Sequence, residues 1–399
     1  MKIVFFSFYF PPDLSAGSFR SVALSKALEK KIRTNDEIHI ITTQPNRYQT
    51  HRVKAKNKEI KGKIIIHRIS VPMHNNGMTS QAYTFIVFAF SAFILCRKVK
   101  PDFIIGTTSR LMTGVLTWIS ASFLRRRYYI DLRDIFSETI SDLFEQKNRF
   151  FSSIFRYFFS FLDKKMLESA SGVNVVSKGF PEYFKKKGIN TDNWSFFPNG
   201  VDEEFLSFPH SVKKSLKSVK TILYAGNIGS GQGLDLVIPE IAKQLGSRYH
   251  FIIVGDGSAF LSLSKAIQAK NISNVELLPP VTRPELIKYY LDADIMFLHL
   301  NNVSAFRRVL PSKIFEYIAL RKPIVAGLSG YSAQFLGEHA PYALLFEPGD
   351  SKAAALSLIE ARNLIIPEKS VDQFLRIYSR ASIMNRMANQ LISIMGLNK

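Results

Sequence analysis

The sequence predicts an α/β protein with two doubly wound parallel-sheet domains in tandem. Its 399 residues are enough for two domains of about 100–200 residues each. Short β-rich runs alternate with segments of helical apolar spacing along almost the whole chain, which is typical of a parallel sheet covered on both faces. A polar, turn-rich break at 198–220 separates two such series.

The elements follow from the apolar pattern in chain order. In the first series, strands are expected at 2–8, 38–43, 64–69, 103–106, 128–132 and 172–176, with helices at 18–31 and 111–125. In the second, strands are expected at 221–225, 250–254, 275–278, 295–298, 323–326 and 343–346, with helices at 235–245, 258–270, 284–293 and 312–319. Ligands of such sheets bind beyond the carboxyl ends of the strands, so the loops that follow the strands are the places to search.

The last helical stretch, 370–395, is long enough to cross back to the first domain. The expected division is therefore an N-terminal domain at 1–203, a C-terminal domain at 204–375, and a returning helix at 376–399.

Charge and aromatic content restrict the partners. The net charge is +21, with 31 basic and 15 acidic side chains in residues 1–200 against 22 and 17 in residues 201–399. Such an excess favours nucleic acid, an anionic membrane or phosphorylated ligands. The 33 phenylalanines gather in the basic half in helical segments, which favours a membrane interface over a base-stacking surface. A single cysteine, Cys96, excludes a disulfide framework and indicates a reducing compartment.

Two segments are candidates for contact with lipid. The apolar run 82–96 has fifteen residues, fewer than the roughly 18–20 that cross a bilayer. It is either a core helix or a helix that dips into the membrane. Segment 148–168 is amphipathic and faces either lipid or the core. No secretory signal is visible at the N-terminus. We expect a peripheral membrane protein, not an integral one.

Two glycine-rich turns follow strands of the second series. They are Gly226 to Gly233, with the sequence GNIGSGQG, and Val254-Gly255-Asp256-Gly257. Glycines at this position let the backbone approach an anion, and the next helix supplies N–H donors. Each turn alone can equally be a simple tight turn. The first is not a Walker A loop, because no Gly-Lys-Ser/Thr follows.

A third element decides between these interpretations. Segment 306–317 places Arg307, Arg308 and Lys313 beside Ser312, the expected N-cap of a helix. Three cations at a helix N-terminus call for an anion. Glu316, one turn later, is suited to accept hydrogen bonds from a ribose diol. Diphosphate and ribose together indicate a nucleotide sugar. The alternative is a solvated helix in which Glu316 forms an intrahelical pair.

These residues stand in the order found in retaining GT-B glycosyltransferases of family 4. The sequence most resembles the bacterial surface-polysaccharide branch of fucosamine-transferase-like, WbuB-type proteins. The resemblance spans almost the whole chain, and it rests on Phe10-Pro11-Pro12 with Gly17 and Arg20, 131–138 (DLRDIFSE), 177–180 (SKGF), 198–202 (PNGVD), 224–229 (YAGNIG), 232–234 (QGL), 254–257 (VGDG) and 311–316 (PSKIFE).

The resemblance implies a GT-B fold, in which two Rossmann-like domains face each other across a cleft and a C-terminal helix returns to the N-domain. It implies that Glu316 binds the donor ribose and that Asp134 lies near the reacting centre. Further residues implied at the donor are Gly17, Gly229, Gln232, Gly233, Asp256, Arg307, Arg308, Ser312 and Lys313. Those implied on the acceptor side are Arg20, Arg133 and Glu138.

Two departures from the family pattern concern the donor site. Arg308 stands where many members have the first glutamate of a Glu-x7-Glu pair. Asn227 and Gln232 replace a basic residue and a lysine of the glycine loop. The phosphate charge would then be met by Arg307, Arg308 and Lys313. The resemblance implies no obligatory metal. In the sequence, the eight histidines lack ligand spacing, and Asp292-Ala293-Asp294 precedes a strand, at the wrong end for a metal–diphosphate site.

The expected function is glycosyl transfer. The donor would be a nucleotide-diphospho-sugar, UDP-linked, and the acceptor a polyprenyl-diphosphate-linked saccharide of bacterial O-antigen or capsule synthesis. The protein would work in the cytoplasm, peripherally on the anionic inner face of the cell membrane, with retention of configuration. Two alternatives are a non-catalytic scaffold of a polysaccharide assembly complex and a sugar-nucleotide epimerase on the same fold. Nucleic-acid binding rests only on the basic pI and is not expected.

Overall fold

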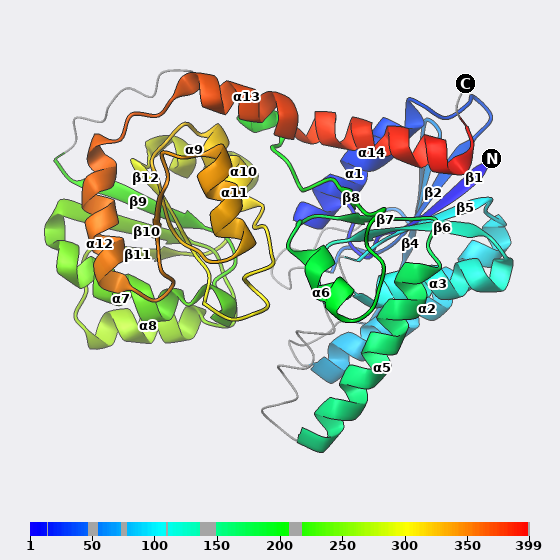
Figure 1. The fold of residues 1–399 in the computed structure, drawn as a ribbon, viewed down its shortest axis with the longest axis horizontal. Helices are drawn as coiled ribbons and strands as arrows, with labels where there is room; N and C mark the ends of the chain where they lie inside the picture. The colour runs from blue at the N-terminus through cyan, green and yellow to red at the C-terminus, as the bar shows by residue number, and fades with distance from the viewer. Residues whose placement is uncertain are drawn as a thin grey trace. The chain divides into compact units, whose positions relative to one another are not determined.

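The computed structural model describes residues 1–13, 15–46, 55–72, 78–108, 111–135, 149–206 and 218–397. The chain forms two compact units: Met1–Asn199 together with Arg380–Lys399, and Gly200–Ser379. Each unit contains a sheet with helices on both faces (Figure 1), which is the predicted fold class. The sequence had placed the boundaries after residues 203 and 375.

In the described residues, the sheet of the first unit has eight strands in the order β3-β4-β2-β1-β5-β6-β7-β8. The strands are β1 (Lys2–Phe6), β2 (Glu37–Thr43), β3 (Lys58–Lys61), β4 (Ile64–Ile69), β5 (Phe103–Thr107), β6 (Arg127–Leu132), β7 (Gly172–Val175) and β8 (Ser195–Phe196). All neighbours pair in parallel except β3, which is antiparallel to β4. Strands such as β5 are buried at every residue, because helices cover both faces of the sheet.

The helices of this unit form two layers. They are α1 (Ala16–Glu29), α2 (Met78–Val99), α3 (Leu111–Leu124), α5 (Arg149–Glu168), α6 (Phe180–Lys186) and α14 (Arg380–Met395). In the strand order given above, α1 connects β1 to β2, toward the β3 end of the sheet. Helices α2, α3 and α5 connect β4 to β5, β5 to β6 and β6 to β7, toward the β8 end. Because such crossovers are right-handed, α1 lies on one face of the sheet and α2, α3 and α5 lie on the other. Accordingly, α1 packs against α14, whereas α3 packs against both α2 and α5 (Figure 1).

Helix α2 is longer than the sequence suggested. It has 22 residues instead of the fifteen of the apolar run, because Met78–Gln81 and Arg97–Val99 extend the helix at both ends. Its segment Ser80–Val99 has a mean hydropathy of 1.6, so it is long and apolar enough to cross a membrane, and a third of the segment is buried. Phe85, Phe88, Ala92 and Cys96 form its buried side, and the helix contacts β1, β2 and β4. In this fold α2 is therefore a layer helix of the first unit.

The second unit has a parallel sheet with the strand order β11-β10-β9-β12-β13-β14. The strands are β9 (Lys220–Ala225), β10 (Tyr249–Val254), β11 (Val275–Leu278), β12 (Ile295–His299), β13 (Ile324–Gly327) and β14 (Leu344–Phe346). The helices are α7 (Leu234–Leu245), α8 (Phe260–Ala269), α9 (Arg283–Asp292), α10 (Lys313–Ala319), α11 (Tyr331–His339), α12 (Ser351–Glu360) and α13 (Glu368–Tyr378). The chain order reverses between β9 and β12, and this switch point is where an open α/β sheet binds its ligand.

The prediction of a single C-terminal helix from residue 370 onward is wrong. Two helices, α13 and α14, meet at Ser379, whose ψ of 137° is not helical. Helix α13 stays in the second unit because Phe374 and Tyr378 pack against Phe315 and Phe335. The return to the first unit therefore begins at Arg380 and not at residue 376.

Candidate active site

The two glycine turns of the second unit pack directly on each other at the carboxyl ends of β9 and β10. The Gly226 N–H donates to Val254 O at 2.8 Å, and the Ile228 N–H donates to Asp256 O at 2.9 Å. A Cβ at Gly255 would overlap the Gly226 carbonyl. Gly226 and Gly255 both have φ near 145° (143° and 148°), a conformation that only glycine adopts without strain. The glycines therefore shape one continuous backbone surface and are more than independent turns.

Gln232 holds the first turn in shape. Its Oε1 accepts hydrogen bonds from Asn227 Nδ2 at 2.8 Å and from the Gly229 N–H at 3.0 Å. Tyr224 Oη donates to Asn227 O at 2.5 Å. The amide oxygen of Gln232 is therefore engaged inside the loop. The two residues that depart from the family pattern thus bond to each other, and the donor contact expected of Gln232 stays a prediction.

Gly233 begins α7 in a left-handed conformation, with φ of 58°. The Asn301 side chain occupies the space that a Cβ at Gly233 would need, and Asn301 Nδ2 donates to Ser230 O at 2.6 Å. A close approach of two chain segments, together with this φ, therefore requires glycine at this position.

His299 fixes the other end of the same turn. This fully buried side chain accepts a hydrogen bond at Nε2 from the Gly349 N–H at 2.9 Å. Nδ1 must then carry the proton, and it donates to Gln232 O at 2.6 Å. The imidazole is thus neutral, and burial lowers its pKa below the ordinary 6.5.

This pKa predicts a pH effect on stability. Because the folded pKa is lowered, the stabilisation is complete above pH 6.5 and is lost as the pH falls below that value, at no more than about 1.4 kcal/mol per pH unit. We expect the urea midpoint of the wild type to fall more between pH 7 and pH 5 than that of His299→Gln, because the Gln amide can make both hydrogen bonds without titrating. Equal pH slopes in the two proteins would contradict this assignment.

Lys313 lies over the first glycine turn. Its side chain fills the space beside Gly226 where a Cβ would stand, and Nζ lies 5.2 Å from the centroid of the Tyr224 ring. Burial lowers the pKa of Lys313, and the nearby Glu316 carboxylate opposes this shift. Within the described ranges, no hydrogen bond or ion pair to its ammonium group is found. A partly desolvated cation set over a glycine turn is suited to an anion.

Glu316 lies one helical turn beyond Lys313 in α10, and both of its oxygens have partners. Oε2 accepts a hydrogen bond from Tyr290 Oη at 2.9 Å, and Oε1 lies 3.5 Å from Arg283 Nη1. Burial and this carboxylate raise the pKa of Tyr290 well above its ordinary value, so the tyrosine remains a donor. The carboxylate is therefore held in one orientation, and each oxygen keeps lone pairs for further hydrogen bonds.

Arg283 and Tyr290, both in α9, are site residues that the sequence analysis missed. The Arg283 guanidinium also pairs with Glu204 and with Asp202, the latter at 3.4 Å, and it lies 4.7 Å over the Phe205 ring. Burial opposes its charge, but these carboxylates outweigh burial and raise the pKa of Arg283. In the sequence, Arg283 appears only as the first residue of a capped helix, and no motif connects it to Glu316.

The other residues predicted at the donor differ in how exposed their side chains are. Asp256 is exposed, and its Oδ1 accepts the Gly257 N–H at 2.7 Å. Arg307 is exposed and donates to Asn302 Oδ1 at 2.9 Å, whereas Arg308 is half-buried. Ser312 stands at the N-cap of α10, as predicted, but its backbone is already helical and its side chain makes no capping hydrogen bond. The helix is short, so its N-terminal dipole contributes less than was expected.

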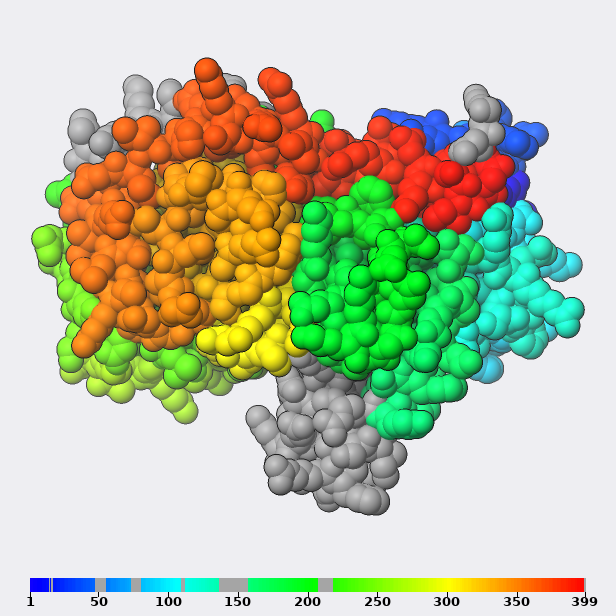
Figure 2. Space-filling model, viewed as in Figure 1, coloured from blue at the N-terminus to red at the C-terminus, as the bar shows by residue number. Residues whose placement is uncertain are grey.

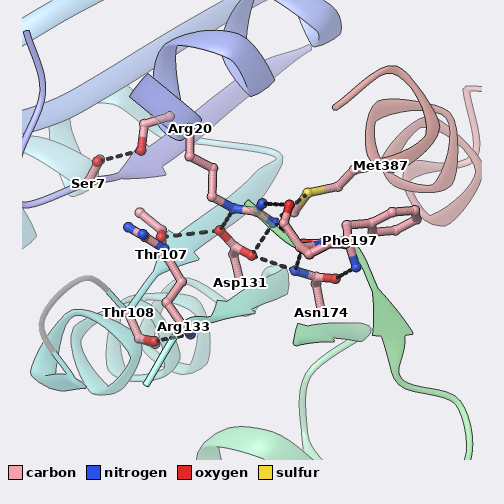
Figure 3. Close-up of polar contacts among 11 residues, drawn as sticks. Ser7, Arg20, Thr107, Thr108, Asp131, Arg133, Asn174, Phe197 and Met387 are labelled. Atoms are coloured by element: carbon pink, nitrogen blue, oxygen red, sulfur yellow. Dashed lines mark hydrogen bonds and ion pairs between the residues drawn. The ribbon is translucent and has the colours of Figure 1, made fainter. Parts of the chain in front are cut away.

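On the acceptor side, the structure places Arg20 inside the first unit (Figure 3). Its side chain is 1% exposed and forms a two-pronged ion pair with Asp131 at 2.8 and 2.9 Å. Arg20 also donates to Pro198 O and Phe197 O, and Asn174 donates to Asp131 at 2.7 Å. These donors of Arg20 are therefore used inside the first unit, and the acceptor-side role expected of Arg20 stays a prediction. Gly17 lies buried in α1, and Glu138 lies outside the described residues.

Arg133 and Asp134 come directly after β6, the strand that carries Asp131 of this network. The Arg133 N–H donates to Thr108 Oγ1 at 2.9 Å, while its Nε is buried without a hydrogen-bond partner in the described part of the chain. Burial lowers the pKa of Arg133 to about 10. Desolvation of the carboxyl by surrounding protein atoms raises the pKa of Asp134 to about 6, and the Arg133 charge opposes this shift. Part of the Asp134 residue remains exposed to solvent. An unsatisfied guanidinium and a carboxyl that titrates near neutral pH are features of functional sites.

No metal-ligand cluster is found among the described residues: no three His, Cys, Asp or Glu side chains gather to hold an ion. Asp294 of the Asp-x-Asp sequence lies before β12, where its Oδ2 accepts the Thr221 N–H at 2.9 Å and its Oδ1 lies 3.4 Å from Lys220 Nζ. This carboxylate is therefore used to join two strand ends at the edge of the sheet opposite the glycine turns.

Comparison with known proteins identifies the second unit. Residues 209–372 match the family model "Glycosyl transferases group 1". WcaI of Escherichia coli K12, assigned to colanic acid biosynthesis as a glycosyl transferase, is 24% identical over 297 residues, which are 71% of this chain and 72% of WcaI.

Solved structures match the whole fold. Anabaena HepE in complex with UDP and glucose has a TM-score of 0.69 at 16% identity, covering 98% of this chain and all of HepE. Sucrose-phosphate synthase from Thermosynechococcus elongatus has a TM-score of 0.75 at 15% identity, covering all of both chains. By the group 1 glycosyl transferase domain at 209–372 and the similarity to WcaI, the chain is a glycosyltransferase, and the solved structures show that its fold is GT-B.

Proposed function

We propose that this enzyme transfers a sugar from a UDP-linked nucleotide sugar to a polyprenyl-diphosphate-linked saccharide during synthesis of a bacterial surface polysaccharide. The observation that carries the donor assignment is Lys313, a partly buried ammonium without a hydrogen bond or ion pair in the described residues, set over the Gly226 turn. The complex of HepE with UDP and glucose and the assignment of WcaI to colanic acid biosynthesis support the substrate classes. An acceptor of this kind implies work at the inner face of the cell membrane, as a peripheral protein.

The residues of the second unit suit the leaving group. The acceptor hydroxyl oxygen attacks the anomeric carbon as the bond from that carbon to the diphosphate oxygen breaks, so negative charge grows on the diphosphate. Lys313, set over the Gly226 turn, would stabilise that charge. Glu316, held by Tyr290 and Arg283, would accept hydrogen bonds from the ribose hydroxyls.

The first unit would supply the acceptor side. Asp134, with its pKa near 6, is the proposed partner of the acceptor hydroxyl, and Arg133 has an unsatisfied nitrogen suited to a phosphate oxygen. Retention of configuration is proposed from the family resemblance, with Arg308 in place of the first glutamate.

Thermal unfolding with nucleotides tests the donor site. A ligand at 100 times its Kd stabilises the native state by about 2.7 kcal/mol, so UDP and its sugars should raise the Tm by several degrees. We expect Glu316→Gln to remove most of this shift, because the neutral amide loses the pairing with Arg283 and is a weaker acceptor. Arg283→Gln should weaken UDP binding while leaving an intact Glu316.

Glu360→Gln, an exposed change at the end of α12, is the matched control and should keep the full shift. If no nucleotide raises the Tm, or if the shift survives Glu316→Gln unchanged, the scaffold interpretation replaces the transferase site proposed here.

A further inference from the structure

An unusual apolar surface lies on one helix layer of the first unit. In the described residues of that unit, nine of the ten large apolar side chains that are exposed lie on α2, α3 and α5, and Ile60 is the tenth. They are Tyr83, Ile86, Phe90, Ile94, Ile119, Phe123, Tyr157, Phe158 and Phe161. We call their outer surface the α2/α3/α5 face. A concentration of this kind marks an interaction site, because isolated surface apolar residues are normally scattered.

Helix α2 has two apolar sides. Its inner side, with Phe88 and Cys96, is fully buried, which accounts for packing on the sheet. Its outer side repeats at three and four residues through Tyr83, Ile86, Phe90 and Ile94, with Ile86 and Phe90 more than 60% exposed (64% and 69%). Packing on the sheet accounts for the apolar residues of the inner side. It does not account for those of the outer side, which contact no core in the monomer.

Basic side chains collect at one end of the same face. Because α2, α3 and α5 all run antiparallel to the parallel strands, their C-terminal ends lie at the same edge of the layer. Exposed there are Arg97, Lys98, Arg125, Arg126, Lys164 and Lys165. Arg97 lies 5.1 Å over the Phe123 ring, and Lys165 lies 5.9 Å over the Phe161 ring. Two of the cations thus lie over exposed aromatic rings of the same face.

The lysine cluster at 185–187 adds little to that charge. Lys185 pairs with Asp192 at 2.9 Å and Lys186 with Glu182 at 2.8 Å, so the cluster at 185–187 is largely neutralised. By contrast, the acidic residue exposed at the end of α5, Glu168, lies 3.9 Å from Lys164 and offsets only one of the six cations.

We propose that the α2/α3/α5 face docks on a lipid bilayer that contains anionic headgroups. Aromatic and aliphatic side chains would enter the interface while Lys and Arg meet the headgroups. A second copy of the chain fits less well, because the face offers it six cations and only one exposed carboxylate, Glu168, as a complement. The N-terminal ends of α2 and α5 begin at the carboxyl edge of the sheet, the edge that carries Arg133 and Asp134. A lipid-linked acceptor in the bilayer would therefore lie near the residues proposed to receive it. This proximity rests on the proposed function, whereas the docking face itself does not.

Vesicle flotation of the full-length chain without nucleotide tests the proposal. We expect binding to phosphatidylcholine vesicles containing phosphatidylglycerol and little binding to pure phosphatidylcholine. The double change Ile86→Ser and Phe90→Ser should weaken binding about tenfold or more. Lys164→Gln and Lys165→Gln should each weaken it about fivefold at low salt. Leu261→Ser, an equally exposed change (72%) on α8 of the second unit, should have no effect.

Three results would overturn the docking face: no flotation of the wild type, unchanged flotation of the double variant, or a solution dimer that the same double change dissociates while vesicles are not bound. Circular dichroism melting of each variant verifies folding. The nucleotide-dependent Tm shift, measured without vesicles, separates the two proposals. If that shift persists while flotation fails, the donor site stands and the docking face falls.

Discussion

Replacing Lys313 by methionine is expected to lower the rate of sugar transfer by about 10²–10³-fold, because it removes one preorganised charge from the leaving diphosphate. Methionine keeps the apolar stem next to Gly226 and the Tyr224 ring but carries no positive charge. The loss should appear mainly in kcat, since the charge on the leaving diphosphate is largest in the transition state. Steady-state kinetics with a UDP-sugar and a lipid-linked saccharide acceptor would measure it.

Two comparisons make this result specific. Lys265→Met removes an exposed lysine of α8 and should leave kcat unchanged. The melting temperature of Lys313→Met should match or exceed that of the wild type, because burial of the ammonium is itself unfavourable. A decrease in kcat of less than threefold would show that the diphosphate charge is met elsewhere, for example by Arg307 or Arg308.

Removing the Asp131 carboxylate should destabilise the first unit by about 3–5 kcal/mol, since it leaves a buried guanidinium without its partner. Arg20 and Asp131 are each 1% exposed. Burial alone would raise the pKa of Asp131, but Arg20 and Asn174 hold it below its ordinary value. Asp131→Ala therefore strands Arg20 between Asn174, the carbonyls at 197–198 and Met387 of α14 (Figure 3).

Urea unfolding followed by tryptophan fluorescence would measure this loss. Both tryptophans, Trp118 and Trp194, belong to the first unit, so the signal reports on that unit and not on the second. Glu182→Ala, which breaks the exposed pair with Lys186, is the control and should cost less than about 1 kcal/mol. If Asp131→Ala costs no more than the control, the buried pair does not hold the first unit together.

The last helix, α14, belongs to the first unit. Figure 2 shows residues of the C-terminal end, in red, packed against residues of the first unit, and α14 contacts α1. Arg127 contributes by donating to Ile394 O at 2.9 Å, and Tyr129 Oη donates to Gln390 at 3.0 Å. These contacts explain why the last helix belongs to the first unit although it is distant in sequence.

The sequence by itself determined the fold class and most of the strands, because a parallel sheet buried on both faces demands continuous runs of Ile, Val and Phe such as residues 3–6. It also singled out the glycine turns, Lys313 and Glu316, since a backbone conformation at positive φ and a close approach leave a local signature. Short or polar elements such as β3 and β8 escaped it, because their pairing partners, and not their own composition, make them strands.

Tertiary structure alone decided which partners the charged residues have. Nothing near Arg20 in sequence shows that Asp131, 111 residues away, consumes its donors, and nothing near Glu316 shows that Arg283 and Tyr290 orient it. The same holds for α2, whose apolar residues look alike in sequence until the sheet covers one side and leaves Ile86 and Phe90 exposed. Local patterns record the geometry of the backbone. The partners of a charge and the exposure of a side chain depend on segments that only folding brings together.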